Sequence, residues 1–428
     1  MNRHRCLLVA VVAAGLLTSC GGGSGSNNSG GAHGSETSTV NPSPYTSPEH
    51  VAPKTRLSVP SLYDTSHGWE SDLPGERLTL PHSRAVAVFR EGLHDGTFTV
   101  LDVTSGQTLW KTEVEGPGMM SALSITMKGK DYLVASASGS KGADIVSKGR
   151  EVTTIDIFPA RATGYDVKPA HHLELNGEGA VSNGGGGLLV ELDDDVIMTV
   201  NPATGATKRY DLRKMEPPAD ECKLCLGATE AVAVTPRGPL LTKDNHLPGG
   251  HYWVQGAWSG GALTTTKSVF IAPVKDSLVA QWYDKGAGND TWAVLDPSTG
   301  EVRAEVDCAP NRGRGDDEGA TLSANGRYLI RSHTAFDLEK GTGRCFEETD
   351  RDKPVHLTGV TDDGIAFGVV ALTAAQTRTG PRVTIDLATG QVKASDYVIA
   401  PSDDYSGYGL FWDDSDSTDT MVAYPHST

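Results

Sequence analysis

The sequence predicts an all-β chain built from repeated four-stranded antiparallel units. Three observations predict this fold class. The chain contains 50 glycines among many Thr and Val residues, no segment after Cys20 keeps a helical apolar period for three turns, and one turn pattern recurs along the chain. This combination is typical of strands joined by tight turns, so we expect very little helix.

Each copy of the recurrent turn begins with Asp or Asn and ends with Gly. In such a turn the first side chain accepts hydrogen bonds from free backbone amides, and Gly takes the left-handed position that closes the hairpin. Regular copies begin at Asp102, Asn201, Asp296, Asp337 and Asp386, and a stretched copy begins at Asp156. A degenerate copy within residues 251–261 fills the one double-length gap. The pattern therefore gives seven units with a period of about 40–50 residues.

A second glycine turn precedes several of these copies. Its glycines are Gly129, Gly238, Gly326 and Gly364. Two hairpin turns in a unit imply four strands, and four-stranded units of this period are the blades of a β-propeller. Strand-like segments at 56–62, 408–412 and 421–424 remain outside the seven units. They either complete the first blade or build an eighth; we expect seven blades, with eight as the alternative.

The most complete copy of the turn runs Asp102-Val-Thr-Ser-Gly-Gln-Thr-Leu-Trp110. This pattern resembles the quinoprotein-like repeat of pyrroloquinoline-quinone-type propellers, over roughly residues 75–395. The resemblance implies the propeller architecture, with Trp110 alone keeping the tryptophan that docks neighbouring blades in that family. Quinone-dependent dehydrogenases of this type are expected to carry adjacent cysteines, a calcium site and a Trp platform. This chain has no adjacent cysteines, and we expect no cofactor.

The N-terminus predicts export and lipid anchoring. Arg3 and Arg5 precede an uncharged apolar run at 7–17, which is shorter than the about 20 residues of a membrane span and suits a signal peptide. The run ends in Leu17-Thr18-Ser19-Cys20, which resembles the bacterial lipobox and implies diacylglycerol on Cys20; the alternative is an ordinary signal peptide with an incidental cysteine. Residues 21–55 are rich in Gly, Ser and Pro and predict a disordered tether, with the propeller at 56–428. We expect an extracytoplasmic protein held at the cell membrane by its lipid.

The net charge of −17 becomes −19 when Arg3 and Arg5 leave with the signal peptide. Such a charge disfavours nucleic acid and direct adsorption to an anionic membrane surface. A protein partner is expected to be neutral or basic, and the chain itself is expected to be a monomer.

Four cysteines remain in the predicted propeller, at 222, 225, 308 and 345. Disulfides are the default outside the cytoplasm, and four cysteines allow three pairings. Cys308 and Cys345 follow the turns of adjacent units, so we expect them to pair and leave Cys222 and Cys225 to close a small loop. A redox pair or half a metal site is the alternative for the Cys222-Lys-Leu-Cys225 motif, but it follows two prolines in a loop rather than opening a helix. No metal site is expected.

No linear catalytic motif is present, so we expect a non-enzymatic envelope protein that uses the propeller as a protein-binding or scaffold surface. Tyr252, Trp253 and Trp258 lie among glycines in a long insertion and are the candidate contact residues, since Tyr and Trp dominate interface energetics. The alternative is that these aromatic residues are buried in the degenerate fourth unit. The alternative function is an extracellular enzyme, a hydrolase or lyase or else a quinone-dependent dehydrogenase, with a site assembled from blade loops.

Overall fold

The computed structural model describes residues 53–428 except 143–145, 147, 194, 217–227, 229, 244–250, 261–267, 284–288, 310–318, 372–379 and 414–419. In these described residues the chain forms β-strands and two 3-10 helices, η1 (Pro81–Ser83) and η2 (Leu212–Lys214), with no α-helix. The expectation of an all-β chain with very little helix is therefore confirmed.

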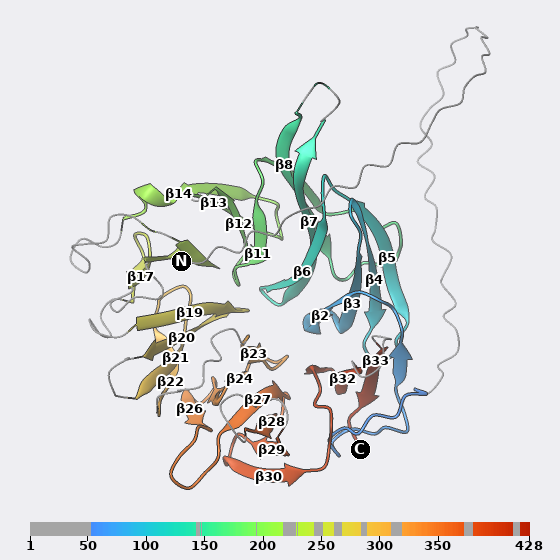
Figure 1. Ribbon diagram of the computed structural model, residues 1–428, viewed down its shortest axis with the longest axis vertical. Coiled ribbons are helices and arrows are strands. Elements are labelled where there is room, and N and C mark those ends of the chain that lie inside the picture. The colour runs from blue at the N-terminus through green and yellow to red at the C-terminus, as the bar shows by residue number, and fades with distance from the viewer. Residues whose placement is uncertain are drawn as a thin grey trace, which may run out of the picture. The chain divides into compact units, whose positions relative to one another are not determined.

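The strands form four-stranded antiparallel blades that follow one another along the chain (Figure 1). Blade one consists of β2 (Glu76–Leu80), β3 (Ala85–Glu91), β4 (Asp95–Asp102) and β5 (Thr108–Glu115). Blade two consists of β6 (Met120–Met127), β7 (Lys130–Lys141), β8 (Arg150–Pro159) and β10 (His171–Asn176). Blade three consists of β11 (Ala180–Asn183), β12 (Leu188–Asp193), β13 (Val196–Val200) and β14 (Thr207–Asp211). Blade four consists of β15 (Glu230–Thr235), β16 (Gly238–Lys243), β17 (His251–Val254) and β18 (Trp258–Ser259).

Blade five consists of β19 (Ser268–Val274), β20 (Ser277–Tyr283), β21 (Asp290–Leu295) and β22 (Val302–Cys308). Blade six consists of β23 (Thr321–Leu322), β24 (Tyr328–Arg331), β25 (Thr334–Asp337) and β26 (Thr342–Cys345). Blade seven is β27 (Val355–Val360), β28 (Ile365–Val370), β29 (Arg382–Asp386) and β30 (Gln391–Ser395). Two parallel contacts link neighbouring blades: β5 pairs with the short β9 (Gly164–Tyr165), and β22 pairs with β26.

The two ends of the chain build an additional blade together. The C-terminal strands β31 (Asp403–Tyr405), β32 (Tyr408–Asp413) and β33 (Thr420–Pro425) form three strands, and the N-terminal β1 (Trp69–Ser71) pairs antiparallel with β33 as the fourth. The described residues thus form eight four-stranded units, which is the alternative count and not the seven that the turn pattern favoured. The turn pattern missed this blade because the connection between its third and fourth strands is the break between the chain ends.

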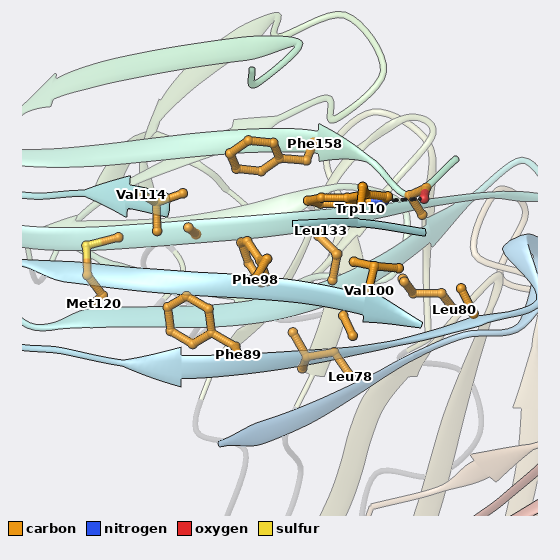
Figure 2. Close-up of a cluster of buried hydrophobic side chains, with 14 of the residues drawn as sticks. Leu78, Leu80, Phe89, Phe98, Val100, Trp110, Val114, Met120, Leu133 and Phe158 are labelled. Carbon is orange, nitrogen blue, oxygen red and sulfur yellow. Dashed lines mark hydrogen bonds between the residues drawn. The ribbon is translucent and has the colours of Figure 1, made fainter. Parts of the chain in front are cut away.

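Buried apolar side chains gather between consecutive blades. In the described residues, eight clusters each join one pair of neighbours, and two of them join blade seven to eight and blade eight to one. Figure 2 shows the cluster between blades one and two, in which Phe98, Trp110 and Phe158 contact one another through their rings. Because the series of clusters returns to blade one, the blades close into a ring without an unpaired seam.

The predicted Asp turns form as expected. In the first, the Asp102 carboxylate accepts hydrogen bonds from the amides of Thr104 and Ser105, and Gly106 has a φ of +65°. The turns at Asn201, Asp296, Asp337 and Asp386 repeat this arrangement. A side chain with a beta carbon adopts such a left-handed φ only at a cost, which explains why each turn ends in Gly.

A flat nitrogen donor from the outermost strand of one blade caps the Asp turn of the next. Trp69 donates to the carbonyl of Val103, and Trp258 donates to that of Pro297. Trp110 donates to a carbonyl of the stretched turn in blade two. Arg344 donates to two carbonyls of the turn in blade seven, and His171 lies 3.2 Å from a carbonyl of the turn in blade three. The resemblance implied that Trp110 alone docks neighbouring blades, but other side chains share this role.

The two ends of each blade differ. Because the strands are antiparallel, the turns between the first and second strands share one end with the Asp turns; we call this the tight-turn end. The connections between second and third strands, and those between blades, share the opposite end, the long-loop end. The longest connections of the long-loop end span 212–229, 309–320 and 371–381.

Candidate functional site

A cavity of about 310 Å³ lies among the innermost strands at the tight-turn end. Its lining comes from five blades: Thr79 of blade one, Lys275 of blade five, Leu322 of blade six, Val360 of blade seven and Asp403 of blade eight. The first strands of successive blades contact one another around the centre of the ring. The cavity is thus the inner opening of the propeller, where residues distant in the sequence meet.

Among the described residues that line this cavity, Lys275 is the one lysine. It occupies the turn between β19 and β20 and has a φ of +49°, a region that residues other than Gly seldom adopt. Its Nζ donates to the carbonyl of Leu322 at 3.4 Å. Burial lowers the pKa of Lys275, and the surrounding Asp403, Asp131, Asp362 and Asp276 oppose this shift.

Asp403 shares the cavity with Lys275. Burial raises the pKa of this carboxyl to about 7, while Lys275 and a hydrogen bond from Thr79 favour its charged form. A carboxyl with a pKa near neutral holds a proton in a large fraction of molecules at neutral pH. The cavity therefore contains both an amine that is easier to deprotonate and an acid that is harder to deprotonate than usual.

Asp404 connects the cavity to the closure of the ring. One of its carboxylate oxygens, Oδ2, lies 2.7 Å from the Tyr63 hydroxyl and 2.7 Å from Nε2 of His426. The hydrogen bond to Asp404 raises the pKa of His426. Since Tyr63 belongs to the N-terminal segment and His426 to the C-terminus, Asp404 joins the two ends of the chain.

An exposed apolar pair lies at the long-loop end of blade one. Leu93 and Met119 are 66% and 65% exposed, although both are large apolar residues. Leu93 lies in the turn from β3 to β4, and Met119 lies in the connection to blade two. Backbone hydrogen bonds from Gly116 to His94 and from Met120 to Gly92 hold these two segments side by side. Large exposed apolar side chains that gather in one place are a feature of protein contact surfaces.

Four exposed carboxylates lie at the same end of blade one, one at the long-loop end of each strand: Glu76, Glu91, Asp95 and Glu115. Asp95 and Glu115 are direct cross-strand partners, and like charges in this arrangement repel each other. Burial and the charge of Glu91 raise the pKa of Glu76. We call Leu93, Met119 and these four carboxylates the acidic–apolar patch.

The predicted contact residues Tyr252, Trp253 and Trp258 do not form an exposed surface. Tyr252 and Trp253 belong to β17 and are only 2% and 1% exposed. Trp258 packs on Gly300 and donates to Pro297, so it docks blade four onto blade five. The prediction was wrong because the degenerate fourth blade uses these aromatic residues for packing, which was the stated alternative.

The predicted disulfide is present: Cys308 and Cys345 pair, with their Cα atoms 5.8 Å apart. The bridge joins β22 of blade five to β26 of blade six, beside the parallel contact between the same strands. Cys222 and Cys225 lie outside the described residues, as does Cys20.

The described residues contain no group of three or more His, Cys, Asp or Glu side chains arranged to hold a metal ion. They also contain no helix with the length and apolar character to cross a membrane.

The residues of the cavity and of the acidic–apolar patch were not predicted from the sequence. Lys275 and Asp403 are far apart in the chain, and no local pattern joins them. Leu93 and Met119 did leave a signal, because each is an apolar residue in a Gly-rich connection where a polar residue is usual.

No protein-family model matches the chain, and no curated protein matches it either. Solved structures do match. The β-propeller domain of Cps50 (Swd1) from Myceliophteria thermophila is 11% identical with a TM-score of 0.37, over 83% of this chain and 98% of that one. The Dos1 propeller is 11% identical with a TM-score of 0.38, over 84% and 95% of the two chains. Dipeptidyl peptidase 4 from Porphyromonas gingivalis is 13% identical with a TM-score of 0.46, over 83% of this chain and 58% of that one. The sheets and the closed series of interblade clusters identify the fold as a β-propeller.

Proposed function

We propose that this chain is an extracytoplasmic, lipid-anchored scaffold protein that binds a basic protein partner through the acidic–apolar patch. The observation that carries the proposal is the patch itself: two large exposed apolar side chains at the same end of one blade as four exposed carboxylates. Apolar contact supplies binding energy, while the unpaired negative charge selects partners and speeds their encounter.

The charges of the patch argue for a basic partner. Within the described part of the chain, none of the four carboxylates takes part in an ion pair with Lys or Arg. A partner that places Lys or Arg beside Leu or Met side chains would relieve the repulsion between Asp95 and Glu115 and would cover the apolar pair. The net negative charge of the chain also attracts a basic partner over longer distances.

The binding experiment uses a fluorescent peptide of alternating Lys and Leu residues, with a Glu and Leu peptide of the same length as its counterpart. We expect the Lys peptide to bind and the Glu peptide not to bind. A Leu93→Ser and Met119→Ser double variant should weaken binding about tenfold, since losing about half of two apolar burials costs on the order of 1.4 kcal/mol. Fluorescence anisotropy measures both affinities.

A matched control separates this patch from exposed apolar residues in general. Val302 and Val392 are 42% and 45% exposed and lie on the outer strands β22 and β30. A Val302→Ser and Val392→Ser double variant should bind the Lys peptide like the wild type. Equal loss in both double variants, or equal binding of both peptides, would refute the patch as the binding surface.

The anchor is tested separately at Cys20. We expect Cys20→Ala to leave the protein unprocessed or to release it into the medium, because the lipid is attached to this sulfur. Fractionation of cells and medium measures the outcome. A variant that is processed and kept in the membrane fraction like the wild type contradicts the lipid anchor but leaves the binding surface untouched.

A further inference from the structure

Lys275 is held in its turn by close backbone packing. A beta carbon added to Gly185 would lie 2.9 Å from the carbonyl oxygen of Lys275 and 3.0 Å from the beta carbon of Pro273. The glycine segment of blade three therefore packs directly against this turn of blade five. Lys275 therefore keeps its left-handed φ within a closely packed turn.

The amine of Lys275 has weak partners for a group in a cavity. Its hydrogen bond to the Leu322 carbonyl is long, at 3.4 Å. In the described residues no carboxylate oxygen lies within ion-pair distance of its Nζ, although Asp131, Asp276, Asp362 and Asp403 act on it from farther away. Burial dominates over these charges and favours the neutral amine. The neutral form of an amine is the nucleophile, and burial makes this form easier to reach at Lys275 than at an exposed lysine.

Asp403 supplies the complementary group. It lines the same cavity, and Thr79 donates a hydrogen bond to its side chain. Because burial raises its pKa to about 7, this carboxyl can both donate and accept a proton at neutral pH.

We propose that Lys275 is a covalent site for a small aldehyde or ketone, with Asp403 as its proton donor. The neutral Nζ adds to the carbonyl carbon and forms a carbon–nitrogen bond. One amine proton and the proton of Asp403 pass to the carbonyl oxygen, which leaves as water as the carbon–nitrogen double bond forms. The second amine proton returns to Asp403, so that an imine remains. Water reverses the reaction, and no oxidant or reductant takes part. The cavity of about 310 Å³ limits the ligand to a small molecule.

This site is independent of the proposed binding function. The cavity lies at the tight-turn end and its lining comes from blades one, five, six, seven and eight, whereas the acidic–apolar patch lies at the long-loop end of blade one. Variants of Leu93 and Met119 should leave the reaction of Lys275 unchanged, and variants of Lys275 should leave peptide binding unchanged. Failure of one proposal therefore does not imply failure of the other.

Reductive trapping tests the site in the full chain. The protein is treated with acetaldehyde and sodium cyanoborohydride at neutral pH, and peptide mass mapping measures the rate at which each lysine gains an ethyl group. The references are Lys128 and Lys130, which are exposed around a turn at the same end of the ring. We expect Lys275 to react faster than either, since a lowered pKa raises the fraction of the amine that is neutral.

Two variants assign the roles. Asp403→Asn should slow trapping at Lys275 and leave Lys128 and Lys130 unchanged, and Lys275→Arg should abolish the fast reaction. Thermal melting checks that each variant folds. The comparison of Lys275 with Lys128 and Lys130 is made in the wild type, so the site remains testable even if a variant does not fold. A Lys275 that reacts no faster than Lys128 and Lys130 overturns the site. An unchanged rate in a folded Asp403→Asn variant overturns the role of Asp403.

Discussion

At the scale of single residues, the docking side chains show how one task is met by different chemistry. Trp69 and Trp258 cap the Asp turn of the following blade with an indole, while Arg344 does so with a guanidinium. All of them are flat and donate from nitrogen to a turn carbonyl. A search for Trp at one fixed spacing from the turn therefore finds Trp110 and misses the others. The role depends on shape and on an N–H group, and the sequence position of the donor varies from blade to blade.

Trp258 gives the residue-scale prediction. We expect Trp258→Ala to lower the free energy of unfolding by about 3 kcal/mol, because it removes a large packed side chain and a hydrogen bond to Pro297. Urea unfolding measures the change. Binding of the Lys peptide should not change in the folded variant. If stability stays at the wild-type value and peptide binding is lost, Trp258 belongs to a contact surface after all.

At the scale of elements, the turns were predictable and the sites were not. An Asp turn is specified by five consecutive residues, so the turns at 102, 201, 296, 337 and 386 follow directly from the sequence. The eighth blade has no such turn between its third and fourth strands, because β33 ends the chain and β1 begins it. The cavity requires the relative placement of five blades, which no local pattern contains. Sequence reasoning thus reached the repeat and missed what the closed ring brings together.

The disulfide gives one element-scale prediction. Cys308 and Cys345 are 37 residues apart in the sequence, and closing a loop of this length in the unfolded chain contributes about 4 kcal/mol by the chain-entropy relation. We expect a Cys308→Ala and Cys345→Ala double variant to lose about that much stability, measured by urea unfolding without reductant. Reducing agent should then have little further effect on the region between blades five and six. A double variant as stable as the oxidised wild type contradicts this prediction.

The glycine segment at 184–187 gives the second prediction at the scale of elements. Added beta carbons would lie 2.6 Å from a Val234 methyl at Gly184 and 2.5 Å from the Val234 carbonyl oxygen at Gly186. We expect Gly186→Ala to destabilise the protein by about 2 kcal/mol, since the backbone must move to admit the methyl group. Gly319→Ala is the matched control, because a beta carbon there meets nothing within 4 Å. Thermal melting should show a clear drop for the first variant only, and equal melting of both would argue against tight packing of this segment.

At the scale of the whole molecule, several groups hold their protons more tightly in the folded chain. Burial raises the pKa of Asp403 and of Glu347 to about 7, and the bond to Asp404 raises the pKa of His426. A group whose pKa rises on folding adds stability at low pH and loses it as the pH passes the folded value. All three groups therefore act in the same direction, whereas the lowered pKa of Lys275 acts against them at higher pH, and stability should fall between about pH 5.5 and pH 7.

This prediction is checked by urea unfolding across that pH range in the wild type and in Asp403→Asn. The wild type should become less stable as the pH rises, and the variant should show a shallower dependence because one of the titrating groups is gone. Carboxyls with lowered pKa values, such as Asp337 and Asp386, act only in more acidic solution and do not disturb this range. A wild type that gains stability from pH 5.5 to pH 7 would contradict the assignment.

The pairing of β1 with β33 has a mechanical consequence. A pull on the chain ahead of residue 53 reaches the ring first through the segment that holds Tyr63 and then through β1, which is only three residues long. β1 joins the ring through backbone hydrogen bonds to β33, through Trp69 on the turn of blade one, and through no covalent link to its partner strand. Under tension this strand is the first part of the sheet to carry load. The blade that closes the ring is thus also the first that such tension would open, whereas the disulfide lies between blades five and six.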